Sequence, residues 1–265
     1  MTKGFLCCLR KDVKEVLRGG KLIVFGILIA AIAILILCST LVFSDMPEAL
    51  WQQLPGFDID ALEGVISSLY PRNVRENVGI FAYYIGLFYS IGAILVTFNI
   101  LPKEREQGKW ILPRQQGYSG SEFVFSKCLV YGLFAGGCVF AGYLLYYLAA
   151  NLCMERNMPL GNAIALALIH CINLCIIICY TQLFSVLWKN PVIAAVSMIS
   201  TIIFVPDIAG YLSFGKMLPT YLLTFVYDSC SSYGDVIVPL TENLAILVLL
   251  GILTDMKMCK EDGMG

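Results

Sequence analysis

Four stretches of this chain carry no charged side chain and are each longer than 20 residues: 22–43, 78–101, 128–152 and 160–187. A helix needs about 20 consecutive apolar residues to cross the hydrocarbon core of a bilayer, which is about 30 Å thick. The composition agrees, because 58% of the residues are hydrophobic and only 14% are charged, against about 25% charged residues in soluble domains. The sequence therefore predicts an integral membrane protein, and each stretch is predicted to be a spanning helix.

The same balance excludes other classes of protein. A soluble domain of 265 residues would need more polar side chains for its surface, and so apolar a chain is not disordered. The 18 basic and 19 acidic residues give a net charge of −1, so no basic excess exists to hold the phosphates of a nucleic acid. The expected environment is the lipid bilayer, with no nucleic-acid partner.

Two further stretches complete the predicted fold. Residues 191–212 are apolar up to Pro206 and Asp207, where a spanning helix would either break or continue, and residues 236–254 carry Glu242 near one end. The chain is thus predicted to be an all-α membrane protein with six spans, forming one transmembrane domain over residues 1–265. The apolar segment 217–227 is too short to span and suits a re-entrant or interfacial helix before the last span.

Basic residues are distributed unequally between the two sides of this arrangement. With the N-terminus inside, 14 Lys and Arg residues fall on the inner side and four on the outer side, namely Arg72, Arg75, Arg156 and Lys216. Loops rich in Lys and Arg face the cytoplasm. We therefore expect a multi-pass protein of the plasma membrane with both termini in the cytoplasm.

The segment before the first span is predicted to be an amphipathic helix on the membrane surface. Its apolar residues recur at helical spacing: Phe5, Leu9, Val13 and Val16. Its basic residues fall mostly on other faces of the helix: Arg10, Lys11, Lys14 and Arg18. Such a segment can lie among the lipid headgroups. The alternative is a charged flank that only sets the orientation of the chain.

The chain offers no pattern for enzymatic chemistry, so we expect no enzyme and no cofactor in it. A phosphate-binding loop is missing, because Glu15 stands where a glycine should precede Gly20-Lys21. The four long spans contain no Asp, Glu, Lys or Arg for ion coupling. His170 is interpreted as a packed, hydrogen-bonding residue in preference to a proton relay.

Small residues recur inside two of the spans. Gly132 and Gly136 have the spacing that lets helices approach closely, either within the chain or against a second copy. Cys171, Cys175 and Cys179 follow at intervals of four residues. Thiols on one stripe of one helix do not enclose a tetrahedral metal site, so we interpret them as helix-contact residues.

The inner loop between the second and third spans carries the strongest functional signal. It opens with Pro102 and then combines charged and apolar residues: Lys103, Glu104, Arg105, Glu106, Gln107, Gly108, Lys109, Trp110, Ile111 and Leu112. This mixture is typical of a short helix that docks on another protein.

This loop resembles the corresponding loop of bacterial ABC-2 type transporter permeases. In that family the second span is followed by a stretch like R-E-R-E-x-G-T, and further on a Ser/Gly-Lys opens the third span. Residues 103–108 are similar to the first motif and Ser126-Lys127 to the second, although Lys109 replaces the common Thr. The basic N-terminal segment and the six predicted spans are also similar to that family.

The resemblance implies a permease subunit of an ATP-driven exporter. ATP and Mg²⁺ would then bind a separate cytoplasmic ATPase subunit, and a second permease copy, identical or not, would complete the transporter. A coupling helix between spans 2 and 3 would contact the ATPase through the following residues: Glu104, Arg105, Glu106, Gly108, Lys109 and Trp110. The transported substrate is not indicated.

Two other functions are compatible with the sequence. The chain could be a membrane anchor or sensor subunit that recruits a cytoplasmic protein through the same loop without transporting anything. A less favoured alternative is an ion-coupled carrier that uses His170.

Overall fold

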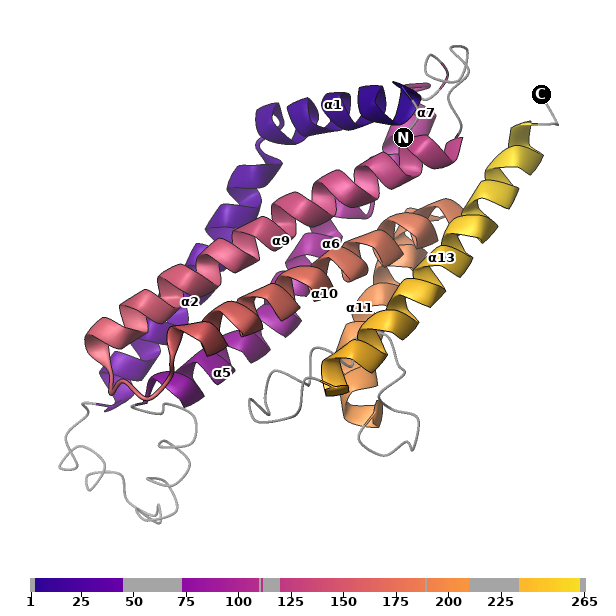
Figure 1. Cartoon of the computed structure of the whole chain (residues 1–265). Helices are drawn as coiled ribbons and strands as arrows, with labels where there is room; N and C mark the ends of the chain where they lie inside the picture. The colour runs from indigo at the N-terminus through magenta and orange to yellow at the C-terminus, as the bar shows by residue number, and fades with distance from the viewer. Residues whose placement is uncertain are drawn as a thin grey trace, which may run out of the picture.

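The computed structural model describes residues 3–44, 73–109, 111, 120–188, 190–209 and 234–262. The regular secondary structure in these ranges is helical (Figure 1), and a single backbone bridge joins Asn73 to Glu155. The elements are α1 (Lys3–Arg18), α2 (Lys21–Ser44), α5 (Val74–Tyr84), η1 (Ile85–Tyr89), α6 (Ser90–Thr97), α7 (Ile100–Glu106), α9 (Gly120–Cys153), α10 (Leu160–Leu187), α11 (Pro191–Ala209) and α13 (Gly234–Asp262). The predicted all-α class is confirmed for this part of the chain.

Five helical stretches are long and apolar enough to cross a membrane: Lys21–Val42, Val74–Glu106, Glu122–Cys153, Leu160–Leu187 and Val236–Met258. They correspond to five of the six predicted spans. The second and third stretches are longer than the predicted 78–101 and 128–152, because the helices continue into charged segments. This set of helices is that expected of a multi-pass membrane protein.

The remaining predicted span, the fifth along the chain at residues 191–212, is only partly matched. It corresponds to α11, whose apolar part, Pro191–Val205, is shorter than the other five. At 1.5 Å per residue this part covers roughly 22 Å, less than the roughly 30 Å of a bilayer core. A sixth span therefore stays a prediction. The predicted re-entrant segment, 217–227, lies outside the described residues.

The centre of the bundle is formed by α9 and α10, which lie side by side (Figure 1). A Cβ atom added to Gly132 would lie 3.4 Å from Cα of Cys175, and one added to Gly136 would lie 2.9 Å from Sγ of Cys171. The small residues thus allow a close approach of two helices of the same chain. Of the two interpretations of the glycine spacing, the structure shows packing within the chain.

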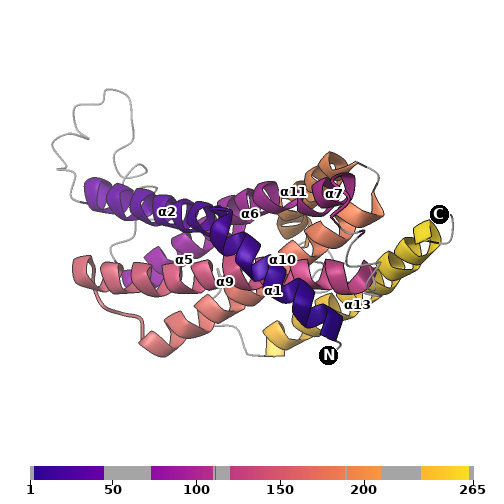
Figure 2. The ribbon, with the colours of Figure 1, turned by 90° about the horizontal axis from the view of Figure 1, so that it is seen from above.

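One end of the bundle is closed by α1, which lies across the bundle instead of along it (Figures 1 and 2). The corner between α1 and α2 is formed at Gly20, whose φ of +72° is favourable for glycine alone. Cys8 of α1, Phe123 of α9 and Met258 of α13 share one buried cluster. The N-terminal helix and the C-terminal part of α13 therefore meet at the same end, which also carries α7.

Candidate functional site

A buried lysine joins three helices at this end of the bundle. Lys127, near the start of α9, has a side chain with no exposed surface. Its Nζ lies 2.9 Å from Oδ1 of Asp12 and 3.7 Å from Oε2 of Glu15, both on α1. The same Nζ lies 3.0 Å from Oε1 of Glu104 on α7. One ammonium group therefore connects α9 to the N-terminal helix and to the end of the second spanning stretch.

Two further lysines complete what we call the charge cluster, defined as Lys11, Asp12, Glu15, Lys21, Glu104 and Lys127. Nζ of Lys11 lies 3.4 Å from Oε2 of Glu104 and 3.6 Å from Oδ1 of Asp12. Nζ of Lys21 lies 3.5 Å from Oε1 of Glu15. With three carboxylates and three ammonium groups, the cluster is electrically neutral when all six groups are ionised.

Hydroxyl and aromatic groups surround the cluster. Ser126 donates a hydrogen bond to Oδ2 of Asp12. Lys21 donates to the hydroxyl of Tyr131 at 2.7 Å, and that hydroxyl donates to Oε1 of Glu15 at 3.3 Å. Nζ of Lys11 lies 4.7 Å from the centre of the Phe123 ring, a favourable cation–π distance. Buried charges need such paired and hydrogen-bonded surroundings, because each one loses its hydration.

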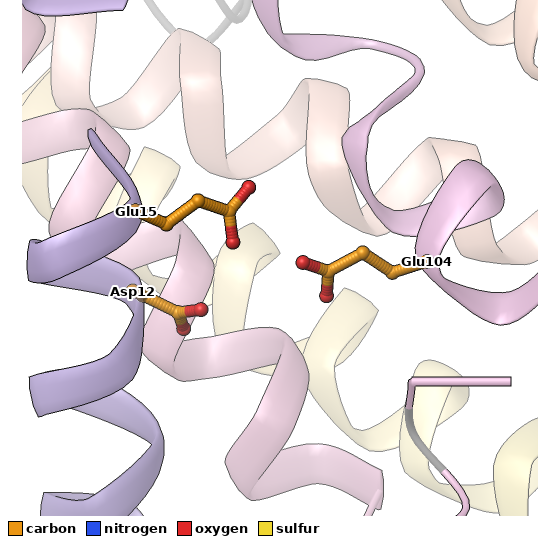
Figure 3. Close-up of side chains that lie close together, drawn as sticks. All are labelled: Asp12, Glu15 and Glu104. Carbon is orange, nitrogen blue, oxygen red and sulfur yellow. The ribbon is translucent and has the colours of Figure 1, made fainter. Parts of the chain in front are cut away.

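The carboxylates of the cluster face one another from two helices. Figure 3 shows Asp12 and Glu15 on α1 pointing toward Glu104. Partial burial favours a higher pKa for the Glu15 carboxyl, but the nearby positive charges of Lys127, Lys21 and Lys11 outweigh it and lower the pKa of Glu15 to about 2. Glu15 therefore stays ionised at neutral pH and holds α1 on the bundle.

The three carboxylates could also be considered as metal ligands. Asp12, Glu15 and Glu104 each offer an oxygen atom, and these atoms lie within 4.8 Å of one another. The ammonium group of Lys127, however, lies at 3.0 Å or less from two of these residues. The protein thus supplies its own cation here, and the arrangement is that of an ion-pair network.

The end of α7 has the geometry of a Schellman motif. The N–H of Gly108 donates to the carbonyl of Arg105, and the N–H of Lys109 donates to the carbonyl of Glu104, both at 3.0 Å. The motif requires a left-handed residue after the helix, and Gly108 has a φ of +67°. The glycine of the loop motif therefore has a structural role, which is to end α7 and turn the chain.

The structure separates the predicted docking residues into two groups. Glu104 points into the charge cluster and is buried. Glu106 and Lys109 are exposed, and Arg105 is half-buried. Trp110 lies outside the described residues. A docking surface at this end can therefore use the exposed residues after Glu104, whereas Glu104 connects that surface to α1 and α9.

The N-terminal surface helix buries a charged residue together with its apolar ones. Phe5, Leu9 and Val13 are half-buried, and Val16 is fully buried. The most buried side chains of α1 include Cys8, Asp12 and Val16. These three recur at intervals of four residues, so a charged residue occupies the middle of the buried stripe.

Asp12 and the buried role of Lys127 were missed by the sequence interpretation. The available signal was the position of Asp12, four residues from both Cys8 and Val16, which places it on one stripe with two apolar residues. A carboxylate on such a stripe needs a cation. Lys127, which immediately precedes the apolar stretch 128–152, is a candidate for it.

A cavity of about 370 Å³ lies beside the charge cluster. Its walls come from the ends of α1 and α2 and from the segment between α6 and the turn after α7: Glu15, Lys21, Val96, Asn99, Ile100, Lys103, Glu104, Gln107 and Lys109. Several of these residues are exposed, so the cavity opens to the surface: Asn99, Lys103, Gln107 and Lys109.

Taken together, the site contains a largely buried ion-pair network, an exposed polar turn and an adjacent cavity. Such a network suits mechanical connection between helices better than proton transfer, because its charges are already paired. No protein-family model matches this chain, and no curated protein matches it. Its function is therefore inferred from the site and from the sequence.

Proposed function

We propose that this protein is the permease subunit of an ATP-driven transporter of the ABC-2 type, working as an exporter with a separate ATPase subunit. The observation that carries the proposal is the charge cluster, which joins α1, α7 and α9 through Lys127. These are the surface helix, the loop helix and the third span that the sequence resemblance assigns to the ATPase-facing side. In the proposed transporter all six predicted spans cross the plasma membrane and both termini are cytoplasmic.

The proposed mechanism treats the three helices as one lever. The ATPase binds the turn after α7 through Glu106 and Lys109, which are exposed, together with Arg105 and Trp110. Breaking a buried ion pair by removal of one partner costs about 3–5 kcal/mol. A displacement of α7 is therefore transmitted to α1 and α9 while the pairs stay intact. Two such permease copies, moved in this way, would open a path alternately to each side of the membrane.

The binding step is tested by a charge reversal on the exposed surface. We expect Glu106→Lys to prevent co-purification of an ABC ATPase with the tagged full-length chain from membranes of its native host, identified by mass spectrometry. The reversal places a positive charge where the ATPase is proposed to recognise a negative one. Membrane insertion and yield should not change, because Glu106 is exposed.

The matched control is Glu155→Lys. Glu155 is also exposed but lies beside Asn73, at the opposite end of the bundle. This variant should retain the ATPase. Equal recovery of the ATPase with both variants would contradict the docking role of the turn after α7.

A separate assay, ATP-dependent transport by vesicles that contain both subunits, distinguishes a transporter from an anchor or sensor subunit.

A further inference from the structure

The cavity beside the charge cluster has an excess of positive charge. Its two carboxylates, Glu15 and Glu104, are already paired within the charge cluster. Lys103 and Lys109 are exposed, and neither has an ion pair in the part of the chain that the structure describes. The two lysines are thus uncompensated charges on the wall of a cavity.

Amides and apolar side chains accompany these lysines. Asn99 and Gln107 bring side-chain amides that can donate hydrogen bonds. Val96 and Ile100 form an apolar part of the wall. A site with this lining fits a ligand that has an anionic polar group at one end and hydrocarbon next to it.

The position of the cavity indicates where such a ligand comes from. Lys21 is the first residue of one candidate spanning stretch, Lys21–Val42, and Glu104 lies two residues before the end of another, Val74–Glu106. The cavity therefore lies where the apolar part of the bundle ends, at the level of the lipid headgroups. Basic pockets between membrane helices are known to bind anionic headgroups.

We propose that this cavity binds the phosphate of an anionic phospholipid headgroup from the adjacent leaflet. Lys103 and Lys109 hold the phosphate as point charges, and the amides of Asn99 and Gln107 hold its polar neighbours. The first carbon atoms of the lipid lie against Val96 and Ile100. A bound lipid would fill the space between α1 and α7 and stabilise their arrangement. The proposal does not depend on the partner ATPase, but it shares Lys109 with the proposed ATPase contact.

The test measures binding to the purified, delipidated full-length chain in a neutral detergent by isothermal titration calorimetry. The probes are dioctanoyl phosphatidylglycerol, dioctanoyl phosphatidylcholine and inorganic phosphate. We expect the phosphatidylglycerol to bind more tightly than either other probe. The double variant Lys103→Gln/Lys109→Gln should lower its affinity about 30-fold, because two lysines near an anionic group are lost.

Two further variants make the test specific. Arg10→Gln/Lys14→Gln also removes two exposed positive charges, on α1 and away from the cavity, and should leave the affinity unchanged. Gln107→Glu keeps both lysines but adds a negative charge to the wall, and should weaken binding. These substitutions are at exposed positions, so the variants are expected to fold.

Several results would overturn the proposal. If inorganic phosphate binds as tightly as phosphatidylglycerol, the ligand is a free anion and not a lipid. If phosphatidylcholine binds equally well, the site has no preference for an anionic headgroup. Equal affinities for the lysine variant and its control, or no binding of phosphatidylglycerol at all, would show that these lysines form no such site.

Discussion

At the scale of single residues, Lys127 has the strongest influence on the arrangement of the helices. Its side chain is fully buried and its Nζ lies within 3.0 Å of carboxylate oxygens from two different helices. It is the closest and only fully buried cationic partner of Asp12 and Glu104 among the described residues, since Lys11, their other partner, is more exposed and lies 3.4 Å or more from them. Removing the lysine should therefore be much more harmful than removing an exposed one.

We expect Lys127→Met to destabilise the protein by about 3–5 kcal/mol, the cost of removing one partner of a buried ion pair. In detergent solution this should lower the midpoint of thermal unfolding by on the order of 10 °C. Lys14→Met is the matched control, since Lys14 is an exposed residue of α1. Its effect should be within about 0.5 kcal/mol.

A double substitution tests whether the effect comes from the pairing. Lys127→Met combined with Asp12→Asn removes one cation and one anion, and should be less unstable than the sum of the two single variants. Strict additivity, or a Lys127→Met variant as stable as Lys14→Met, would mean that Asp12 and Lys127 do not interact as described.

Much of this residue-scale arrangement could not be predicted from sequence. The loop motif indicated that Glu104 and Lys127 matter, but it suggested that Glu104 contacts another protein. Its burial depends on where α1 lies, and that depends on the corner at Gly20 and on the packing of Cys8. Contacts between residues 93 to 115 positions apart in the chain, such as that of Lys11 with Glu104, leave no local pattern in the sequence.

At the scale of helices, the sequence predicted much more. A bilayer requires long apolar stretches, so their positions could be found by inspection, and α10 (Leu160–Leu187) has the predicted bounds. The helix ends were predicted less well, because charged residues at the ends of spans continue helices into the water. The burial of Asp12 on α1 was also missed, since hydrophobicity alone does not identify a buried aspartate.

The close packing of α9 on α10 leads to a prediction for the glycines of α9. We expect Gly136→Leu to destabilise the protein by about 1–3 kcal/mol through overpacking. An added Cβ would lie 2.9 Å from Sγ and 3.0 Å from the carbonyl oxygen of Cys171, so the two helices would have to move apart. Thermal unfolding in detergent measures the loss.

The neighbouring glycine provides the control for this prediction. A Cβ added to Gly137 would meet no atom within 4 Å, so Gly137→Leu should have little effect on the thermal midpoint. Both variants place the same side chain in the same helix. If they are equally stable, the glycine spacing does not serve the contact between α9 and α10.

At the scale of the whole molecule, the structure and the distribution of charge lead to the same division into two ends. α1, α7 and the C-terminal part of α13 share one end (Figure 1). The bridge between Asn73 and Glu155 lies at the other. The sequence assigned 14 of the 18 basic residues to the side of the N-terminus. The proposed orientation therefore puts the charge cluster and its cavity on the cytoplasmic side.

Two natural cysteines allow this orientation to be measured without altering the chain. Cys7 of α1 and Cys153 at the end of α9 are both exposed, free thiols, and they lie at opposite ends of the bundle. We expect a membrane-impermeant maleimide to modify Cys153 and not Cys7 in intact cells, and to modify Cys7 in inside-out vesicles. Site-by-site mass spectrometry distinguishes the two. Modification of Cys7 with protection of Cys153 in intact cells would reverse the proposed orientation, and the ATPase could then not reach the turn after α7.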